Sequence, residues 1–370
     1  MKSSSDILDL ARANRKILEK HFLEGAHYLS KTLSAFQKHE LNAMLLLAIE
    51  NPVELSRFLK TPFSDLERTI NSPGYKHYTI PKKKGGIREI FAPSERLKSI
   101  QKRLNYYLQA YYLMIKPEDV HGFVVNPHYM GTYCNIVGNA KVHIRKKYVL
   151  NIDLKDFFPS ISGRQVRSLF LSEHFKFPEQ IAIALTLLTT FEGKLPVGAP
   201  TSPVISNFVC LKLDRDLKSF SSLKTFAYTR YADDLTFSSD LPITGDDILD
   251  LINLIKNNGF EINEKKLRLK ASNRKQTVTG LTVNQKVNVD RKLLKRIRAM
   301  LHDMTTNGID TATRRHFNLK TEVDVKHRAK FIHQLEGYIN FVGQVRGKYD
   351  SLCMKYTASF NRAFESKNII

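Results

Sequence analysis

The amino-acid sequence predicts an α+β protein, because segments of helical periodicity and segments typical of antiparallel strands occupy different parts of the chain. Residues 1–75 have helical character, and the last 80 residues change to long amphipathic helices. Between them, residues 78–92, 226–238 and 276–289 each contain two β-rich runs joined by a turn. A chain of 370 residues is long enough for about two to three domains.

The charge balance points to a polyanionic partner. The chain has 58 Lys and Arg against 36 Asp and Glu, a formal net charge of +22, with a pI near 9.7. Hydrophobic residues make up 42% and aromatic residues 10%, so a sizeable core can form and global disorder is excluded. Nucleic acid is therefore the leading class of partner.

Other classes are disfavoured. The longest uninterrupted apolar run, Ala43 to Ile49, is too short to cross a bilayer, and no basic-then-apolar leader follows Met1. The three cysteines, Cys134, Cys210 and Cys353, lie far apart and form no Cys-x-x-Cys pair. Neither a disulfide framework nor a cysteine zinc site is expected. We expect a cytoplasmic protein without a membrane partner.

Residues 78–92 predict a β-hairpin, with Gly85-Gly86 supplying the turn between two short β-rich runs. Two interpretations of its basic tip remain open. A lysine-rich tip is often a solvated edge guarded against aggregation. It can also clamp phosphates, with an arginine offering a planar bidentate fork. The basic residues are Lys82, Lys83, Lys84 and Arg88.

The middle of the chain predicts a sheet with helices. Residues 148–154 form a short apolar run typical of a buried central strand. Ser162 and Gln165 have the spacing of a capping box that starts a helix. A further helix is expected at 178–190, then a turn-rich loop at 195–203 that leads into an apolar helix around 209–217.

After the hairpin at 226–238, a helix is expected at about 245–257 and a short strand at Lys265-Lys266. The hairpin at 276–289 is predicted to turn around Asn284-Gln285-Lys286. Helices follow, the first capped by Asp290. Their apolar stripes comprise Leu293, Leu294, Ile297, Leu301 and Met304, then Phe331, Leu335, Tyr338, Ile339 and Val342. Basic residues fill the rest of the first helix, which favours a grip on a nucleic-acid backbone over a membrane surface.

Three carboxylates carry the expected chemistry. Asp153 lies near the end of the predicted buried strand, and Asp233 and Asp234 lie at the bend of the 226–238 hairpin. Carboxylates at a dry strand end are costly unless a cation neutralises them. If the three converge, they predict two hard divalent ions, Mg²⁺ or alternatively Mn²⁺. Such a pair, about 4 Å apart, stabilises the attacking and leaving oxygens of phosphoryl transfer.

These residues resemble reverse-transcriptase motifs. The ordered set consists of Asp153 in Asp-Leu-Lys-Asp-Phe-Phe-Pro-Ser, Gly198 to Pro203, Tyr231 to Asp234, and Lys265-Lys266 after Gly259. The resemblance runs from about Thr79 to Val289 and implies a right-hand polymerase with fingers, a palm of antiparallel sheet plus helices, and a helical thumb. It implies an N-terminal helical segment at 1–75, fingers with a retron-type region at 76–147, a palm with fingers insertions at 148–289, and a basic thumb at 290–370.

Two further strings resemble those of bacterial retron reverse transcriptases. Asn139-Ala140-Lys141-Val142-His143 fits an Asn-Ala-x-x-His signature, and Val278-Thr279-Gly280 fits a Val-Thr-Gly tripeptide. Either string alone is also what an ordinary loop or strand contains. Together, and correctly placed on a polymerase, they favour a retron enzyme over its relatives.

The resemblance also implies roles for individual residues. Asp153 and Asp233 would be the principal catalytic metal ligands, with Asp234 the accessory carboxylate. Phe158 would be the steric gate under the incoming sugar, whereas Phe157 better fits the palm core. Lys82 to Lys84 and Arg88 would clamp the triphosphate, Gly198 would let the backbone approach the nascent pair, and Lys265 or Lys266 would protonate pyrophosphate. Many reverse transcriptases have Gln where this chain has Val197, so one polar contact to nucleotide or template is missing or supplied elsewhere.

A retron enzyme copies its own structured noncoding RNA, starting from the 2′-hydroxyl of a guanosine in it. The product is branched multicopy single-stranded DNA (msDNA), still linked to RNA. Such systems commonly act in anti-phage defence beside a separate effector protein. The expected partners are therefore the RNA, its DNA product, deoxynucleoside triphosphates and an effector. The candidate RNA contacts are Asn139, His143, Val278, Thr279, Gly280, Arg291 and Lys295, although for His143 a structural hydrogen bond is an equal alternative.

Three rival functions remain. The first is another bacterial reverse transcriptase: a group II intron maturase, a diversity-generating enzyme or a defence-associated polymerase. The second is a two-metal nuclease, for which neither a nucleotide gate nor a fingers clamp is expected. The third is a catalytically idle RNA-binding subunit, against which the intact carboxylate set argues.

Overall fold

The computed structural model describes residues 4–18, 34–82, 85–126 and 134–365. The chain forms two compact units that are interleaved along the sequence. The first comprises Met1–Asn135, Leu150–Phe237 and Pro242–Arg268, and the second comprises Ile136–Val149, Ser238–Leu241 and Leu269–Ile370.

The beginning of the first unit is helical, as the sequence predicted. Its helices are α1 (Ser4–Ala13), α3 (Ala35–Leu47), α4 (Pro52–Phe58), α5 (Phe63–Asn71) and the long α6 (Glu95–Ile115). Local capping fixes several starts: Ser34 and Gln37 form a reciprocal capping box at α3, and Asn51 accepts from the Glu54 amide at α4. These short helices bury their apolar faces against α6 and against one another.

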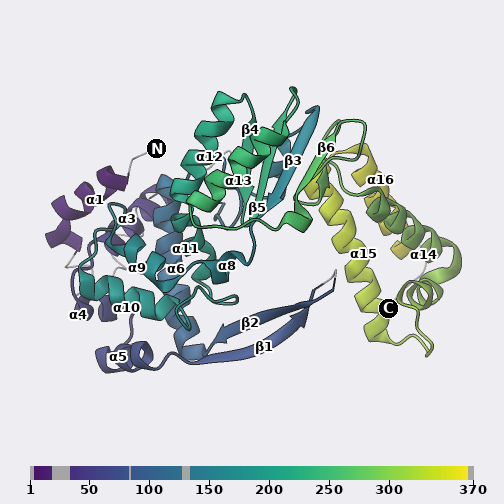
Figure 1. Cartoon of the computed structure of the whole chain (residues 1–370). Helices are drawn as coiled ribbons and strands as arrows, with labels where there is room; N and C mark the ends of the chain where they lie inside the picture. Colours follow the sequence, from purple (N-terminus) through teal and green to yellow (C-terminus); the bar gives the residue numbers. More distant parts are fainter. Residues whose placement is uncertain (1–3, 19–33, 83–84, 127–133, 366–370) are drawn as a thin grey trace. The chain divides into compact units, whose positions relative to one another are not determined.

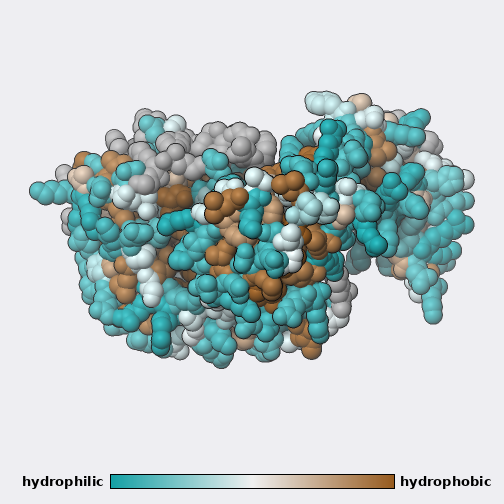
Figure 2. All heavy atoms as spheres, turned by 45° about the horizontal axis from the view of Figure 1, so that its top comes forward, coloured by the Kyte–Doolittle hydropathy of each residue, from teal (hydrophilic) through white to brown (hydrophobic). Residues whose placement is uncertain are grey.

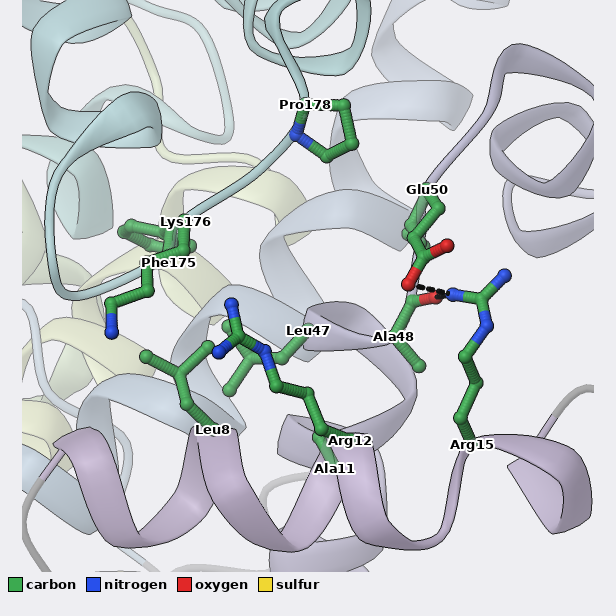
Figure 3. Close-up of a pocket in the computed structure, with 11 residues that line it drawn as sticks. Leu8, Ala11, Arg12, Arg15, Leu47, Ala48, Glu50, Phe175, Lys176 and Pro178 are labelled. Atoms are coloured by element: carbon green, nitrogen blue, oxygen red, sulfur yellow. Dashed lines mark hydrogen bonds and ion pairs between the residues drawn. The ribbon is translucent and has the colours of Figure 1, made fainter.

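Helix α1 is anchored by an arginine. Arg15, just beyond it, donates to the Ala48 carbonyl at 3.0 Å and pairs with Glu54 at 3.0 Å and Glu50 at 2.5 Å. A small pocket of about 110 Å³ lies beside this contact, with Leu8 and other residues on its wall (Figure 3). None of the site residues that the sequence predicted lines it, so we interpret it as part of the packing of α1.

The predicted hairpin is confirmed as β1 (Tyr75–Pro81) paired antiparallel with β2 (Ile87–Pro93). Gly85 and Gly86 have φ of 89° and 85°, the left-handed region that the turn requires. Figure 1 shows the hairpin extending as an arm from the helices of its unit. Two of the predicted phosphate-clamping lysines, Lys83 and Lys84, lie outside the described residues.

The main sheet has the strand order β4-β5-β3-β6. Its strands are β3 (Tyr148–Asp153), β4 (Ala227–Tyr231), β5 (Asp234–Ser239) and β6 (Arg268–Ala271). Strand β3 is therefore central, as its apolar sequence predicted. Helices α12 (Leu211–Leu223) and α13 (Gly245–Asn257) pack together, with α12 against β4 (Figure 1).

Shorter helices complete the first unit: α8 (Phe157–Ser160), α9 (Gly163–Leu171), α10 (Glu179–Thr189) and α11 (Ser202–Val209). The Ser162–Gln165 capping box is confirmed at the start of α9. The apolar helix expected around 209–217 instead begins at Ser202, because Pro203 suits the first turn of a helix. It is divided at Cys210 into α11 and α12. The strand predicted at Lys265-Lys266 is wrong: these residues end a 3₁₀ turn, η1 (Glu264–Lys266), and β6 begins two residues later.

The second unit is built around three long helices, α14 (Arg291–Phe317), α15 (Val325–Arg346) and α16 (Ser351–Glu365). Most residues of the stripes predicted for the first two are buried in one apolar cluster that also includes the strand residues Val278 and Leu281. The stripe residues Leu293, Leu294 and Tyr338 are partly buried and pack against this cluster. Asp290 caps α14 by accepting from the Lys292 amide, and Gly308 interrupts that helix with non-helical backbone.

A short hairpin also belongs to this unit. Strands β7 (Thr277–Val278) and β8 (Leu281–Thr282) are joined by a turn at Thr279-Gly280. Around the turn predicted at Asn284-Gln285-Lys286, the chain forms an isolated antiparallel bridge between Thr282 and Asn288 and no paired strands. Thr279 and Gly280 both have positive φ, 46° and 82°, which matches the two-residue hairpin geometry.

Hydrophilic residues cover most of the face shown in Figure 2, with hydrophobic residues gathered in smaller patches between them. This agrees with the large excess of Lys and Arg. Among the described residues, no helix is long and apolar enough to cross a membrane.

Candidate active site

Three aspartates lie where β3 ends and the neighbouring strand β5 begins. Asp153 ends β3, and Asp233 and Asp234 follow β4 at the bend that leads into β5, the strand next to β3. The Leu154 amide donates to the Asp233 carbonyl at 2.9 Å, which fixes the two segments side by side. The structure therefore brings the three aspartates of the sequence hypothesis to the same end of the sheet.

The carboxylates repel one another. Burial, and then the charge of Asp153, raise the pKa of Asp233, while Lys266 and Arg88 partly offset this rise. Asp234 is exposed, yet desolvation by the surrounding protein raises its pKa to about 6, and the charges of Asp233 and Asp153 add to the rise. A site that disfavours its own negative charge in this way favours a bound cation.

Lys266, and not Lys265, is the lysine at this site. Its ammonium donates to both oxygens of Asp153, at 2.7 and 2.8 Å. Both lysines are exposed on the same 3₁₀ turn, so the contact with Asp153 is what distinguishes Lys266. As arranged here, no group of three or more His, Cys, Asp or Glu side chains in the described part of the chain is positioned to hold a metal ion. The donor chemistry nevertheless fits a hard divalent cation, because three carboxylates converge and an ammonium already neutralises one of them.

The β1–β2 hairpin lies close enough to the carboxylates for its charge to act on them. Its Arg88 is near enough to lower the pKa of Asp233, and its tip residue Lys82 is exposed. The Phe91 amide donates to the Val197 carbonyl at 2.8 Å, which joins β2 to the loop that contains Gly198. Gly198 has φ of 119°, and a Cβ there would meet the Phe91 oxygen at 3.0 Å, so this loop position requires glycine.

The two phenylalanines after Asp153 differ in their surroundings. Phe157 is 6% exposed and its ring lies 5.9 Å from that of Phe260, so it belongs to the core. Phe158 is partly exposed, and its ring is stacked on that of Phe123, with centroids 5.7 Å apart and planes 26° apart. This difference agrees with the assignment of Phe158, and not Phe157, as the gate candidate.

A buried ion pair lies beneath the bend, and the sequence reasoning missed it. Arg230 and Asp214 are 0% and 1% exposed and share two hydrogen bonds of 2.7 Å. The Tyr228 hydroxyl also donates to Asp214, and Arg230 donates to the Ala232 carbonyl at 3.2 Å. Burial opposes the charge on Arg230, but the charge of Asp214 keeps the pKa of Arg230 well above its ordinary value. A lone aspartate on the apolar face of α12 was the available signal.

The segment Asp119–Phe123 packs against β4 of the β4–β5 hairpin. Arg230 and this segment exchange two backbone hydrogen bonds of 2.9 Å, from the Arg230 amide to Asp119 and from the His121 amide to Arg230. At Gly122 the backbones approach so closely that a Cβ would lie 2.3 Å from the Ala232 nitrogen. Ala232 itself has φ of 59°, which is rare for a residue with a side chain.

Gly122→Ala should therefore displace the hairpin and lower both stability and DNA synthesis. We expect a loss of about 1–3 kcal/mol, as for other overpacked sites. Thermal unfolding and primer extension measure the two effects. Gly245→Ala is the matched control, since a Cβ there meets nothing within 4 Å. Equal stability of the two variants would contradict the close approach.

The two retron-type strings meet in the second unit. Helix α7 (Ile136–Lys141) packs on β7 and β8, and the Thr279 hydroxyl donates to the Ile136 carbonyl at 3.1 Å. Asn139, His143 and Val278 are each 0% exposed, and a His143 ring nitrogen lies 2.7 Å from the Ser238 hydroxyl. This arrangement does not support direct RNA contact by these three residues, because none of them has solvent-accessible surface.

The remaining RNA-contact candidates are accessible. Gly280 is exposed at its turn and Thr279 is partly exposed. Arg291 and Lys295 are exposed on the first turns of α14. Arg296 of the same helix lies over the Tyr338 ring, 5.5 Å from its centroid, which is the geometry of a cation–π contact.

Comparison with known proteins identifies the family. The model of the family "Reverse transcriptase (RNA-dependent DNA polymerase)" matches residues 80–283, more than half of the chain. Retron Mx65 reverse transcriptase of Myxococcus xanthus is 35% identical over 269 residues, which cover 66% of this chain and 59% of that protein. Retron Ec86 reverse transcriptase of Escherichia coli is 34% identical over 236 residues, which cover 62% and 69%. The chain thus matches about three fifths of the first relative's length.

Among solved structures, telomerase from Candida albicans in complex with a TWJ fragment of telomeric RNA aligns with 80% of this chain and 64% of that chain. The TM-score of 0.45 and the 10% identity are too low to support an argument about function. The family match and the retron relatives are sufficient to assign the family. Members of this family use divalent metal ions. This chain belongs to the reverse transcriptase family and, within it, to the bacterial retron type.

Proposed function

We propose that this chain is an RNA-directed DNA polymerase that reverse-transcribes a cognate structured RNA. The observation that carries the proposal is the convergence of Asp153, Asp233 and Asp234 at one edge of the sheet. The gate candidate Phe158 and the fingers residue Arg88 belong to the same unit. A nuclease needs the carboxylates but not the other two features, so their combination favours synthesis over hydrolysis.

Each side chain has a part in the proposed reaction. Asp153 and Asp233, with Asp234 as accessory ligand, would hold Mg²⁺, which when bound supplies charge stabilisation for phosphoryl transfer. Arg88 and Lys82 would bind the triphosphate, since Arg offers a bidentate fork to phosphate oxygens. Phe158 would lie under the deoxyribose, where an apolar ring leaves no partner for a 2′-hydroxyl. Lys266 would donate a proton to pyrophosphate.

The retron type of the relatives supports a narrower proposal. The enzyme would start synthesis from a 2′-hydroxyl of its own RNA and release branched msDNA, in an anti-phage system with a separate effector protein. Within this proposal, residues 76–147 and 148–289 serve as fingers and palm, and 290–370 as a basic thumb. The exposed residues Thr279, Gly280, Arg291 and Lys295 would contact the RNA.

The direct test uses the protein with its copurifying nucleic acid. Incubation with deoxynucleoside triphosphates and Mg²⁺ should extend that nucleic acid, and shortening would indicate a nuclease instead. Sequencing the product should yield one DNA that is complementary to one structured RNA. A 2′–5′ branch that resists RNase digestion supports 2′-hydroxyl priming. DNA joined to an ordinary 3′ primer end would refute 2′-hydroxyl priming.

Lys266→Ala should reduce kcat by about 10²-fold or more, the usual contribution of a general acid. Lys265→Ala is the matched comparison, because it removes the same charge one residue away and outside the contact with Asp153. Single-nucleotide incorporation across pH measures both variants. Equal loss of activity in the two variants would contradict the assignment of Lys266.

A further inference from the structure

The gate candidate Phe158 has an aromatic neighbour from a distant part of the chain. The ring of Phe123 is stacked on it at 5.7 Å, the distance and 26° tilt of an offset pair. Phe158 also contacts the ring of Phe157, at 5.5 Å and 38°, and Phe157 is buried in the core. The gate ring thus contacts one buried core ring and one ring that comes from the 119–123 segment.

The backbone at Phe123 is held in an unfavourable conformation. Its φ is 60°, which is rare for a bulky residue and costs free energy unless the surroundings enforce it. Two side chains do so: the amide of Gln109 donates to the Phe123 carbonyl at 3.1 Å, and that of Asn207 donates to the Gly122 carbonyl at 3.0 Å. The strained turn aims the ring of Phe123 at Phe158.

The same segment is registered on the hairpin of the carboxylates. The backbone hydrogen bonds of Asp119 and His121 to Arg230 fix its position along β4, and Gly122 touches the Ala232 backbone. Asp233 follows Ala232 directly in the chain. One short segment therefore sets the position of the gate ring relative to the carboxylates.

We propose that Phe123 is a specificity-determining positioning residue that holds Phe158 against the sugar of the incoming nucleotide. Phe123 acts through Phe158 and not on the substrate itself. When its ring is removed, Phe158 can turn into the vacated space, and the volume under the sugar becomes large enough for a 2′-hydroxyl. The inference rests on the proposed polymerase function and on Phe158 as the gate.

The test compares sugar discrimination in Phe123→Ala, Phe158→Ala and the wild type. Single-nucleotide incorporation gives kcat/KM for a deoxynucleotide and for the matching ribonucleotide. We expect Phe123→Ala to lower the discrimination ratio about tenfold or more, the scale at which apolar pockets distinguish substrates of different size. Phe158→Ala should lower the ratio further. A variant that only weakens the fold would lower both rates together and leave the ratio unchanged.

Two more variants separate positioning from packing. Phe123→Tyr keeps the stacked ring and should retain the wild-type ratio. In the double variant Phe123→Ala/Phe158→Ala, the ratio should equal that of Phe158→Ala alone, because Phe123 has no second route to the sugar. Additive effects would overturn the proposal. Phe220→Leu is the control, since it removes a ring pair elsewhere in the same unit, Phe220 with Phe226.

The outcomes distinguish the inference from the function on which it rests. If the wild type incorporates no deoxynucleotide, the polymerase proposal fails. If it does, but Phe158→Ala leaves the ratio unchanged, the gate assignment fails and the inference with it. If Phe158→Ala lowers the ratio and Phe123→Ala does not, the inference alone is wrong. Should Phe123→Ala fail to fold in thermal unfolding, Phe123→Leu replaces it with the same expectation.

Discussion

Asp233→Asn should abolish DNA synthesis while leaving the fold intact. Asparagine has the same size but lacks the charge needed to hold a divalent cation beside Asp153. A loss of about 4 kcal/mol of charge stabilisation corresponds to a rate decrease of about 10³-fold. Primer extension on the copurified RNA measures this effect.

The same variant should unfold at an equal or higher temperature in metal-free buffer. In the wild type, burial and the charge of Asp153 disfavour the ionised form of Asp233, so removal of that charge relieves repulsion in the folded state. RNA binding should be retained. Asp246→Asn is the control, because Asp246 is an exposed aspartate at the start of α13. Appreciable synthesis by Asp233→Asn would contradict the site.

The two segments that hold the carboxylates were predictable because each has its own local signal, whereas the pairing of β3 with β5 that brings them together was a hypothesis. The apolar run that ends in Asp153 predicts a buried strand, and the bend at Ala232-Asp233-Asp234 predicts a hairpin end. Both predictions depend on the pattern of only a few residues, and both elements form in the structure. Lys266 could not be separated from Lys265 in the same way, because only the 3₁₀ geometry of η1 decides which lysine faces Asp153.

The support for the site was not predictable. Residues 119–123 show neither strand alternation nor helical spacing, and their role comes from contacts with residues more than 100 positions away. Likewise, the burial of Asn139 and His143 follows from the packing of α7 on the β7–β8 hairpin. The sequence showed that these strings mark a retron type, but a string cannot show whether its side chains face solvent or core.

Asp214→Ala should strongly destabilise the first unit. It leaves the guanidinium of Arg230 fully buried without its partner, and breaking such a pair typically costs about 3–5 kcal/mol. The Tyr228 hydroxyl also loses its acceptor, at 2.8 Å. Denaturant unfolding measures the loss. Asp216→Ala is the matched control on the same helix, since its partner Lys212 is exposed and such pairs contribute little.

Replacing the whole buried group distinguishes stability from positioning. The combination of Asp214→Leu, Tyr228→Phe and Arg230→Met removes all three polar partners together. Hydrophobic replacement of a buried ion pair is often neutral for stability or even stabilising, so this variant should recover most of the unfolding free energy lost in Asp214→Ala.

DNA synthesis should not recover with it. Methionine has no donor for the Ala232 carbonyl, which Arg230 holds at 3.2 Å, and Ala232 keeps its left-handed backbone directly before Asp233. Loss of this contact loosens the bend that aims the carboxylates, and displacements of about 1 Å can reduce rates by about 10²-fold. A stable variant with a low kcat would show that the ion pair positions the bend. Full recovery of both properties would instead assign the pair to the stability of the fold alone.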